Sequence, residues 1–210
     1  MERRAMTKMK LCGLRRRADI DYVNAILPEY IGFVFAEKSK RYVKPLIAAD
    51  LRTRLAKEII PVGVFVNEMP EIIAEMVKGK IIDMVQLHGE ENEEYIRELR
   101  ALADCKIIKA FQIRSVKDIE TANLSSADYV LLDSSGGSGK CFNWTLLKEM
   151  KRPYFLAGGL TPENVGKVVE KYHPFAVDAS SSLEINGYKD EEKMADFVKA
   201  VRERTGIENG

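Results

Sequence analysis

The sequence predicts an α/β fold, a closed (β/α)8 TIM barrel in a single domain. Eight short apolar runs lie along the 210 residues, and helix-period segments separate them throughout. A complete barrel of this kind needs about 200 residues, so the chain is long enough for one small barrel. The alternative is a doubly wound open sheet, which has the same local pattern but usually fewer strands.

The eight predicted strands are continuous apolar runs rather than alternating ones, as is typical of parallel strands buried on both faces. They are Met9–Gly13, Ile31–Phe35, Val62–Val66, Met84–Leu87, Ile107–Phe111, Tyr129–Asp133, Tyr154–Ala157 and Phe175–Asp178. If the sheet closes, functional residues are expected at the carboxyl ends of these strands.

The segments between the runs predict amphipathic helices that cover the strands. Ile20, Val23 and Leu27 share one face of the first predicted helix. The corresponding face of the last helix carries Met194, Phe197, Val198 and Val201.

Two helix starts are marked by capping residues. Thr161 places a hydroxyl before Pro162 at a first helical position, and Ser115 followed by Asp118 resembles a capping box. No Pro/Gly/Ser-rich linker divides the chain. Residues 1–8 precede the first apolar run and are expected to be a disordered N-terminal extension, and residues 9–210 are expected to form the barrel.

Composition and charge exclude several classes of partner. Hydrophobic residues make up 46% of the chain and charged residues 31%, which suits a globular domain with a sizeable core. Lys and Arg (33) nearly balance Asp and Glu (32), so neither nucleic acid nor a membrane surface is an expected partner. The basic leader lacks the apolar stretch of a signal peptide, and no run of about 18 apolar residues follows.

The cysteines favour a reducing, cytoplasmic location. Cys12, Cys105 and Cys141 show no CxxC spacing, and an odd number argues against a closed set of disulfides. No cluster has the spacing of metal ligands, and no nucleotide-binding glycine motif occurs. Metal and nucleotide functions are therefore disfavoured.

Two reactive side chains stand at predicted strand ends. Cys12 ends the first apolar run before Gly13 and is a candidate nucleophile or base, although a buried structural cysteine is the alternative. Asp133 ends the sixth run before a glycine-rich loop. Burial there would favour the protonated carboxyl that a proton donor needs, whereas a turn-capping aspartate is the alternative.

Small-residue turns follow the seventh and eighth predicted strands. Gly158 and Gly159 form the first turn, and Ser181 and Ser182 belong to the second. Such residues leave backbone N–H groups accessible, and a short helix after the eighth strand would direct its positive end toward an anion. Barrels commonly bind phosphate with these two loops, so we expect phosphate here; ordinary tight turns are the alternative.

Two further residues are candidate substrate ligands. Arg41 follows the second strand and could hold a carboxylate through its planar fork, although such charge runs are more often solvated loops. His88 follows the fourth strand and could titrate or hold a neighbour by a hydrogen bond, although a lone histidine is more often structural.

Taken in order, the strand ends resemble the phosphoribosylanthranilate isomerase family of tryptophan biosynthesis. The similarity spans nearly the whole chain from Lys10 onward, and its distinctive pieces are Cys12-Gly13 and Gln86-Leu-His-Gly89. The other matching segments are Gly32–Phe35, Lys38–Tyr42, Val62–Asn67, Leu131–Asp133, Gly136–Gly139, Phe142–Trp144, Ala157–Leu160, Asp178–Ser181 and Gly187–Asp190.

This resemblance implies an Amadori rearrangement of a small phosphosugar substrate by general acid/base catalysis without a cofactor. Asp133 would protonate the furanose ring oxygen, and Cys12 would remove the C2′ proton. Arg41 would hold the anthranilate carboxylate. The expected site includes His88, Gly137 and Gly139 as substrate ligands, and Gly158, Gly159, Ser181 and Ser182 as phosphate ligands. The protein is expected to be a monomer or a homodimer.

The implied chemistry requires a thiolate at Cys12. An unperturbed thiol has a pKa of about 8.5 and is only a few per cent ionised at pH 7, so nearby positive charge must assist it. Arg41 and the developing substrate iminium are the expected sources, while Asp133 must keep its proton in the same pocket.

Three residues depart from the family pattern. Arg15 stands where threonine is common, Asn143 stands where aspartate is usual, and Ser182 replaces a common glycine. If position 182 needs a positive φ, serine there would add roughly 1 kcal/mol of strain and weaken phosphate binding.

Other functions remain open at this level, because fold alone does not determine chemistry. A ribulose-phosphate epimerase would need metal ligands, and an indole-glycerol-phosphate synthase relative would use lysine and glutamate at its strand ends. A catalytically silent phosphosugar-binding module is a third alternative, against which the presence of both Cys12 and Asp133 argues.

Overall fold

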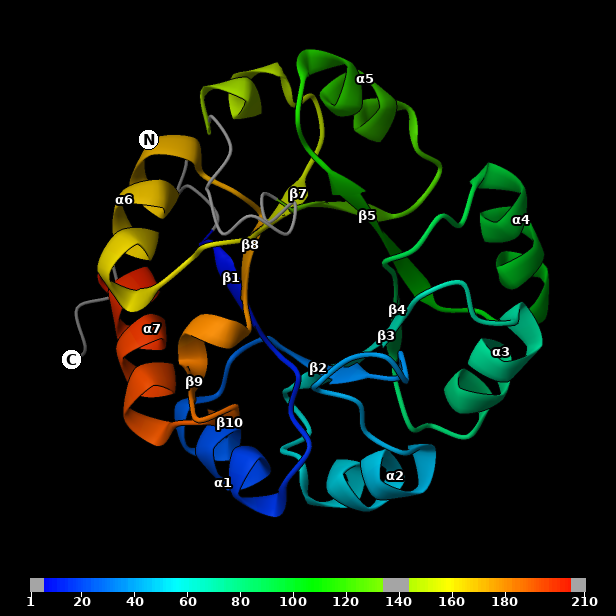
Figure 1. Ribbon diagram of the computed structural model, residues 1–210, viewed down its shortest axis with the longest axis horizontal. Coiled ribbons are helices and arrows are strands. Elements are labelled where there is room, and N and C mark those ends of the chain that lie inside the picture. Colours follow the sequence, from blue (N-terminus) through cyan, green and yellow to red (C-terminus); the bar gives the residue numbers. More distant parts are fainter. Residues whose placement is uncertain (1–5, 134–143, 205–210) are drawn as a thin grey trace.

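Eight parallel strands close into a barrel inside a ring of helices (Figure 1). The computed structural model describes residues 6–133 and 144–204. Neighbouring strands follow the order of the sequence, and β1 (Lys8–Cys12) pairs with β8 (Ala176–Ala179) as well as with β2 (Tyr30–Val34). The pairing of β1 with β8 closes the sheet. The predicted barrel is therefore confirmed, and the open-sheet alternative is excluded.

The other strands lie close to their predicted ranges. They are β3 (Ile60–Phe65), β4 (Met84–Leu87), β5 (Lys106–Gln112), β6 (Tyr129–Asp133), β7 (Tyr154–Ala157) and β8 as given above. The ranges of β4, β6 and β7 match the prediction residue for residue, and the remaining strands differ by one or two residues at each end. Ladder hydrogen bonds rather than hydropathy decide where a strand ends, which explains these differences.

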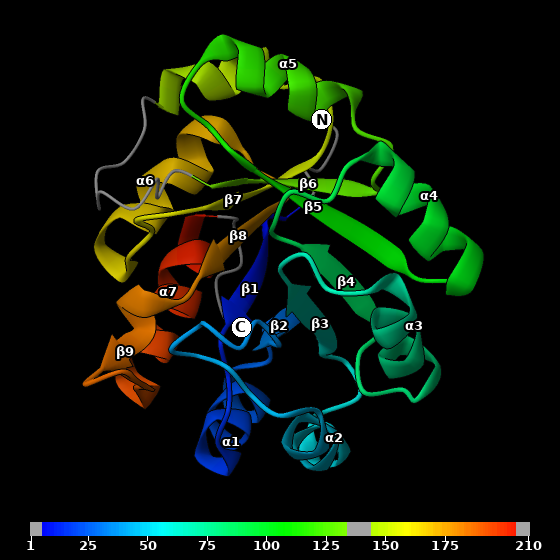
Figure 2. The ribbon, with the colours of Figure 1, turned by 45° about the vertical axis from the view of Figure 1, so that its right-hand side comes forward.

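The helices alternate with the strands and cover the barrel from outside. They are α1 (Arg17–Ile26), α2 (Pro45–Arg54), α3 (Pro70–Lys78), α4 (Glu93–Leu102), α5 (Val116–Leu124), α6 (Pro162–Tyr172) and α7 (Glu191–Arg204), with the 3-10 helices η1 (Trp144–Glu149) and η2 (Ser181–Leu183). The C-terminal helix α7 packs against both α6 and α1 and so completes the outer ring (Figure 2). A small antiparallel pair, β9 (Glu184–Ile185) and β10 (Tyr188–Lys189), precedes α7.

The predicted helix faces and caps are confirmed with one exception. Asp118 accepts hydrogen bonds from the backbone and hydroxyl of Ser115, and Thr161 caps α6. The predicted apolar face of α7 is buried. Leu27, however, was wrongly placed on the buried face of α1: it lies just past the helix in the left-handed region, with φ of 48°, and is 46% exposed. The helical spacing of apolar residues in the sequence continues past Ile26, where α1 ends.

The N-terminal boundary also differs from the prediction. β1 begins at Lys8, whose N–H donates to the carbonyl of Phe175 at 2.9 Å, and the Thr7 hydroxyl donates to the carbonyl of Pro174 at 2.9 Å. Thr7 and Lys8 therefore belong to the barrel rather than to the expected extension. Residues 1–5 of that extension lie outside the described residues.

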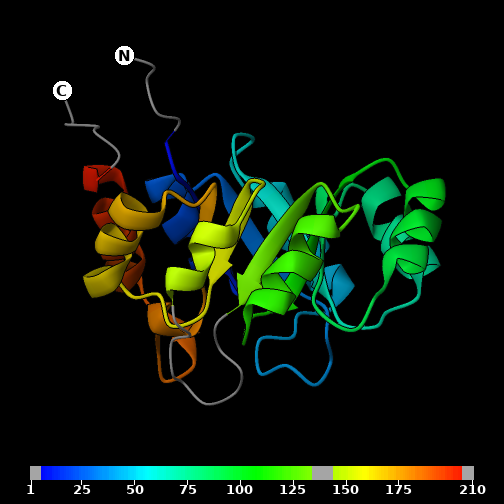
Figure 3. The same cartoon turned by 90° about the horizontal axis from the view of Figure 1, so that it is seen from above.

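The interior of the barrel contains a buried apolar cluster and opens at one end. An apolar cluster of Tyr30, Val62, Met84, Ile108, Leu131, Phe155, Ala157 and Ala176 fills part of it. A smaller cluster of Cys12, Val34 and Val64 lies nearer the carboxyl ends of the strands. The loop after β2 and the orange β9–β10 segment project from that end of the barrel (Figure 3). None of the described helices combines the length and the apolar character needed to cross a membrane.

Candidate active site

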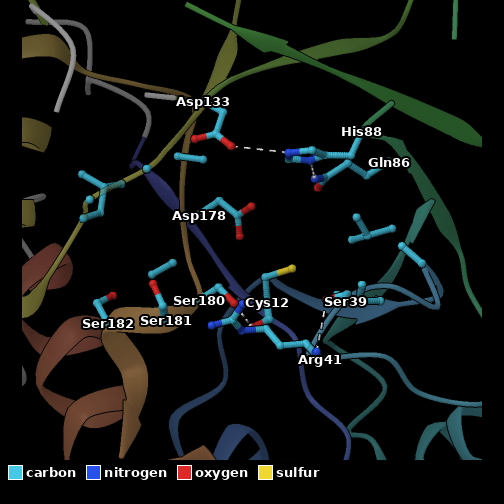
Figure 4. A pocket seen from close by; sticks show the side chains of 18 of the residues that line it. Cys12, Ser39, Arg41, Gln86, His88, Asp133, Asp178, Ser180, Ser181 and Ser182 are labelled. Atoms are coloured by element: carbon cyan, nitrogen blue, oxygen red, sulfur yellow. Dashed lines mark hydrogen bonds and ion pairs between the residues drawn. The ribbon is translucent and has the colours of Figure 1, made fainter. Parts of the chain in front are cut away.

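A cavity of about 340 Å³ opens at the carboxyl ends of the barrel strands. It contains side chains from β1, β4, β6 and β8 and from the loops after β2, β7 and β8 (Figure 4). Its lining residues are Cys12, Val34, Ala36, Ser39, Arg41, Val64, Val66, Gln86, His88, Asp133, Ala157, Gly158, Gly159, Leu160, Asp178, Ala179, Ser180, Ser181 and Ser182. The structure thus brings together every predicted site residue that lies within its described part.

Cys12 is held at the end of β1 by close packing and by its backbone. Its side chain is buried, and the Ser180 hydroxyl donates to its carbonyl at 2.9 Å. A Cβ at Gly32 on the neighbouring strand would lie 2.5 Å from the Cys12 sulfur, so only glycine leaves room for the thiol there. Burial raises the pKa of the Cys12 thiol, although Lys10 acts in the opposite direction.

A buried ion pair between Lys10 and Asp178 lies beside Cys12 in the barrel interior. The Lys10 ammonium is 3.1 and 3.0 Å from the two carboxylate oxygens of Asp178, and it is fully buried. Burial opposes the charged lysine, but the facing carboxylate nevertheless raises the pKa of Lys10 above its usual value. Sequence reasoning missed both residues. Two signals were present: a lysine two positions before Cys12 inside an apolar run, which places both side chains on one face of the strand, and an aspartate at the end of the eighth predicted strand.

Asp133 and His88 face one another on the opposite side of the cavity from Cys12 (Figure 4). The Nε2 atom of His88 lies 3.4 Å from Oδ2 of Asp133, and its Nδ1 atom lies 2.8 Å from the amide nitrogen of Gln86. An amide N–H that faces Nδ1 places the ring proton of a neutral histidine on Nε2, where it can donate to Asp133. The expectation that His88 holds a neighbour by a hydrogen bond is therefore supported, and Gln86 is a second residue that the sequence did not identify.

Arg41 lines the cavity but is not a free side chain. Its Nε and Nη2 atoms donate to the two oxygens of Glu184 at 2.7 and 2.8 Å, and Lys189 donates to the same carboxylate at 2.6 Å. Burial opposes ionisation of Glu184, yet these two cations hold its pKa below the usual value. Arg41 also packs over Gly13, whose φ is 87°. Glu184 and Lys189 could not be found from sequence because no local pattern pairs them with Arg41.

The two small-residue turns lie together at another side of the cavity. Gly158 and Gly159 have φ of 88° and 66°, a region that favours glycine. The Asn164 side chain donates to the Gly159 carbonyl at 2.8 Å and so joins this turn to the start of α6. The predicted short helix after the eighth strand is η2. Ser182 is not among the residues with positive φ, so the strain considered for it does not arise.

Arg15 connects three loops around the mouth of the cavity. Its guanidinium donates to the carbonyl of Lys40 at 2.9 Å and to that of Gly187 at 2.7 Å, and it lies 4.8 Å from the centre of the Tyr188 ring. The departure from threonine therefore adds contacts between the first loop, the loop after β2 and the β9–β10 turn.

Several predicted residues fall outside the described part of the chain. Gly137 and Gly139, together with Cys141 and Asn143, lie within residues 134–143, for which no structure is described. Among residues 6–133 and 144–204, no three His, Cys, Asp or Glu side chains gather as metal ligands.

Comparison of the sequence with known proteins identifies its family. Residues 9–200 match the family described as N-(5'phosphoribosyl)anthranilate (PRA) isomerase. An N-(5'-phosphoribosyl)anthranilate isomerase of Clostridium acetobutylicum is 46% identical over 206 residues, which covers 94% of this chain and 98% of that protein.

Two solved structures with the same fold are named phosphoribosyl anthranilate isomerases. The phosphoribosyl anthranilate isomerase of Thermotoga maritima superposes with a TM-score of 0.84 at 36% identity, over 94% of this chain and 100% of that one. A phosphoribosyl anthranilate isomerase in complex with reduced 1-(o-carboxyphenylamino)-1-deoxyribulose 5-phosphate superposes with a TM-score of 0.82 at 34% identity, over the same shares.

Proposed function

Since the chain belongs to the N-(5'-phosphoribosyl)anthranilate isomerase family, we propose that its cavity performs that reaction with Cys12 as general base and Asp133 as general acid. The activity is the isomerisation of N-(5-phosphoribosyl)anthranilate to 1-(2-carboxyphenylamino)-1-deoxyribulose 5-phosphate in tryptophan biosynthesis. One observation carries the assignment of roles: a thiol from β1 and a carboxyl from β6 face one cavity, between Arg41 and the turns that contain Gly159 and Ser181.

Asp133 acts first, on the ring oxygen of the sugar. Its carboxyl proton passes to the furanose oxygen, the bond from that oxygen to C1′ breaks, and the nitrogen lone pair forms the C1′=N bond of a protonated Schiff base. Asp133 becomes a carboxylate in this step. The His88 ring, whose Nε2 atom lies 3.4 Å from Oδ2 of Asp133, stabilises the charge that forms there.

Cys12 acts second, on the carbon next to the Schiff base. Its thiolate removes the C2′ proton, and the electrons that remain form an enolamine and neutralise the iminium nitrogen. The enolamine becomes the product ketone when C1′ takes up a proton and the C2′ hydroxyl loses one. One acid and one base at separate walls of the cavity suit this sequence, because they must reach different atoms of the same sugar.

The two anionic ends of the substrate are bound by different groups, a guanidinium at one end and backbone and hydroxyl groups at the other. Arg41 receives the anthranilate carboxylate with those donors of its fork that do not bind Glu184. Gly158, Gly159, Ser181 and Ser182 bind the phosphate through accessible backbone and hydroxyl groups. We assign Gly137 and Gly139 to substrate contacts as well, from the sequence alone. A volume of about 340 Å³ suits one small ligand of this kind.

A turnover assay tests the proposed activity directly. The anthranilate fluorescence should fall as the purified chain converts its substrate, whereas mere binding by a silent phosphosugar module would only shift it. We expect turnover of this aminoaldose and none of the related histidine-pathway aminoaldose, because Cys12 stands where barrels with both activities carry an aspartate. A chain that binds the substrate but leaves its fluorescence stable would contradict the activity.

Location and assembly follow from the same premise. We propose that the protein works in the cytoplasm, where tryptophan is synthesised and where its thiols stay reduced. We propose further that it is a monomer or a homodimer, which sedimentation at working concentration would distinguish from larger assemblies.

A further inference from the structure

The charges of Lys10, Asp178, Lys189 and Arg41 act on the Cys12 thiol. Arg41 and Lys189 share the carboxylate of Glu184, so these three residues satisfy one another. Lys10 and Asp178 form a second and separate unit within the barrel. The two units differ in one respect that matters for Cys12: only Lys10 lies on the same strand and the same face as the thiol.

The position of Lys10 calls for a functional reason. Its side chain is fully buried, which is rare for lysine, and well-packed apolar residues commonly replace such buried pairs without loss of stability. An ammonium group has three N–H donors. Two of them meet the oxygens of Asp178 at 3.1 and 3.0 Å, and Lys10 lies on the face of β1 that also carries Cys12.

We propose that Lys10 is a positioning residue for the isomerase reaction: its ammonium stabilises the thiolate of Cys12, and Asp178 keeps that ammonium charged and aimed at the sulfur. The inference rests on the proposed role of Cys12 as general base. It also changes the source of positive charge that the sequence suggested: Arg41 is paired with Glu184 in the loops, whereas Lys10 shares the strand and the face of Cys12.

The electrostatics of the described site agree with the geometry. Burial raises the pKa of Cys12, and the charge of Lys10 is the strongest influence that lowers it. The repulsion from Asp178 is weaker, and Lys189 also acts in the lowering direction. Lys10 therefore offsets part of the cost of burying a thiolate. When Cys12 takes the substrate proton it becomes a neutral thiol, and the Lys10–Asp178 pair stays ionised, so no buried charge is left alone.

The rate of Cys12 alkylation as a function of pH tests this inference, since iodoacetamide reacts with the thiolate only. Cys105 and Cys141 are first replaced by serine, so that a single thiol remains. The central variant is Lys10→Met/Asp178→Asn, which removes both charges and leaves neither buried alone. We expect its alkylation profile to move to higher pH, with a rate at pH 7 lower by about tenfold or more. The rise of kcat with pH should move in the same direction.

A matched control is available at the same end of the barrel. Lys109 and Glu91 form another buried lysine–carboxylate pair, 2.8 Å apart, which does not line the cavity. Lys109→Met/Glu91→Gln should leave the alkylation profile of Cys12 where it is. A Lys10→Met/Asp178→Asn protein that is folded by near-UV circular dichroism and alkylates with the original pH profile would overturn the inference.

A measurement on the unaltered residue pair covers the case in which these variants do not fold. The 15Nζ resonance of Lys10 should change at the pH at which the 13Cβ resonance of Cys12 reports loss of the thiol proton. A Lys10 resonance that is unaffected at that pH would also overturn the inference. Failure of the proposed function would appear separately, as undiminished turnover by Cys12→Ser.

Discussion

Arg41 and Glu184 form a two-point ion pair at the wall of the cavity, with Nε and Nη2 of the arginine 2.7 and 2.8 Å from the two carboxylate oxygens. The pair fixes the plane of the guanidinium before any substrate arrives. A substrate carboxylate then meets a fork that is already oriented, and less side-chain entropy is lost on binding. Lys189 donates to Oε1 of Glu184, the oxygen that also accepts from Nε of Arg41. The carboxylate therefore keeps a partner when Arg41 is removed.

Replacement of Arg41 should therefore affect binding more than chemistry. We expect Arg41→Ala to raise KM by about tenfold or more with a smaller fall in kcat, because a contact made equally in the ground and transition states changes KM. Glu184→Gln should raise KM less, since it loosens the fork without removing it. Steady-state kinetics on both variants give the comparison. An unchanged KM for Arg41→Ala would exclude Arg41 from the substrate site.

Glycine at position 182 should bring no gain, because the strain that the sequence suggested for Ser182 does not arise. Its φ is not positive, so no backbone strain is relieved by Ser182→Gly, and we expect KM to change by less than about twofold. Gly159→Ala is the informative counterpart, because its φ of 66° disfavours a side chain. That variant should weaken phosphate binding by about 1 kcal/mol, roughly fivefold in the inhibition constant for inorganic phosphate. Equal effects of the two substitutions would contradict the assigned geometry.

The buried pair of Lys109 and Glu91 supports the turn that carries His88. Lys109 donates to the carbonyl of Gly89 at 2.7 Å and to Glu91 at 2.8 Å, and Glu91 accepts the N–H of Gly89 at 2.8 Å. Lys109→Met leaves a buried carboxylate without its cation, and we expect it to lower the free energy of unfolding by about 3 kcal/mol. Lys109→Met/Glu91→Gln should recover most of that loss in urea denaturation. A double variant no more stable than the single one would count against this explanation.

Acid should weaken the fold through Asp128. Burial opposes its ionisation, but Lys106 and Arg100 each donate to it at 2.8 Å, and with the Ile107 N–H they hold the pKa of Asp128 below its usual value. A lowered pKa in the folded state contributes stability above about pH 4, and this is lost as the pH falls through the folded value.

The matching experiment compares the original chain with Asp128→Asn. We expect the variant to be less stable by about 1.5 kcal/mol at pH 7, with the difference shrinking toward about pH 2. Urea denaturation across this range measures it. A difference that stays constant down to the acid limit would show that the charge of Asp128 is not the cause.

Much of the barrel fold could be predicted from the sequence because the signals for its strands and helix starts are local. Continuous apolar runs identified all eight barrel strands, and capping residues such as Ser115 and Thr161 marked helix starts. Leu27 shows the limit of periodicity, which does not tell where a helix ends. Asp133 and Cys12 were found because a reactive side chain after an apolar run is conspicuous.

The partners of the site residues could not be predicted from the sequence, for a physical reason. Lys10 and Asp178 are separated by 168 positions, and only closure of β1 against β8 brings them together. In the sequence, Lys10 is a charged residue inside the apolar run Met9–Gly13, and nothing near it in the chain identifies a partner. Glu184 meets Arg41 through the fold of two loops, and no sequence spacing encodes such a contact.

Turnover of N-(5-phosphoribosyl)anthranilate by Cys12→Ser and Asp133→Asn, followed by the fluorescence of the anthranilate group, is the most direct test of the acid/base assignment. Both substitutions nearly preserve side-chain volume, so the fold should survive, as circular dichroism would verify. The account predicts that each lowers kcat by at least about 100-fold, as expected for loss of a general acid or base. Near-original turnover by either folded variant would contradict it.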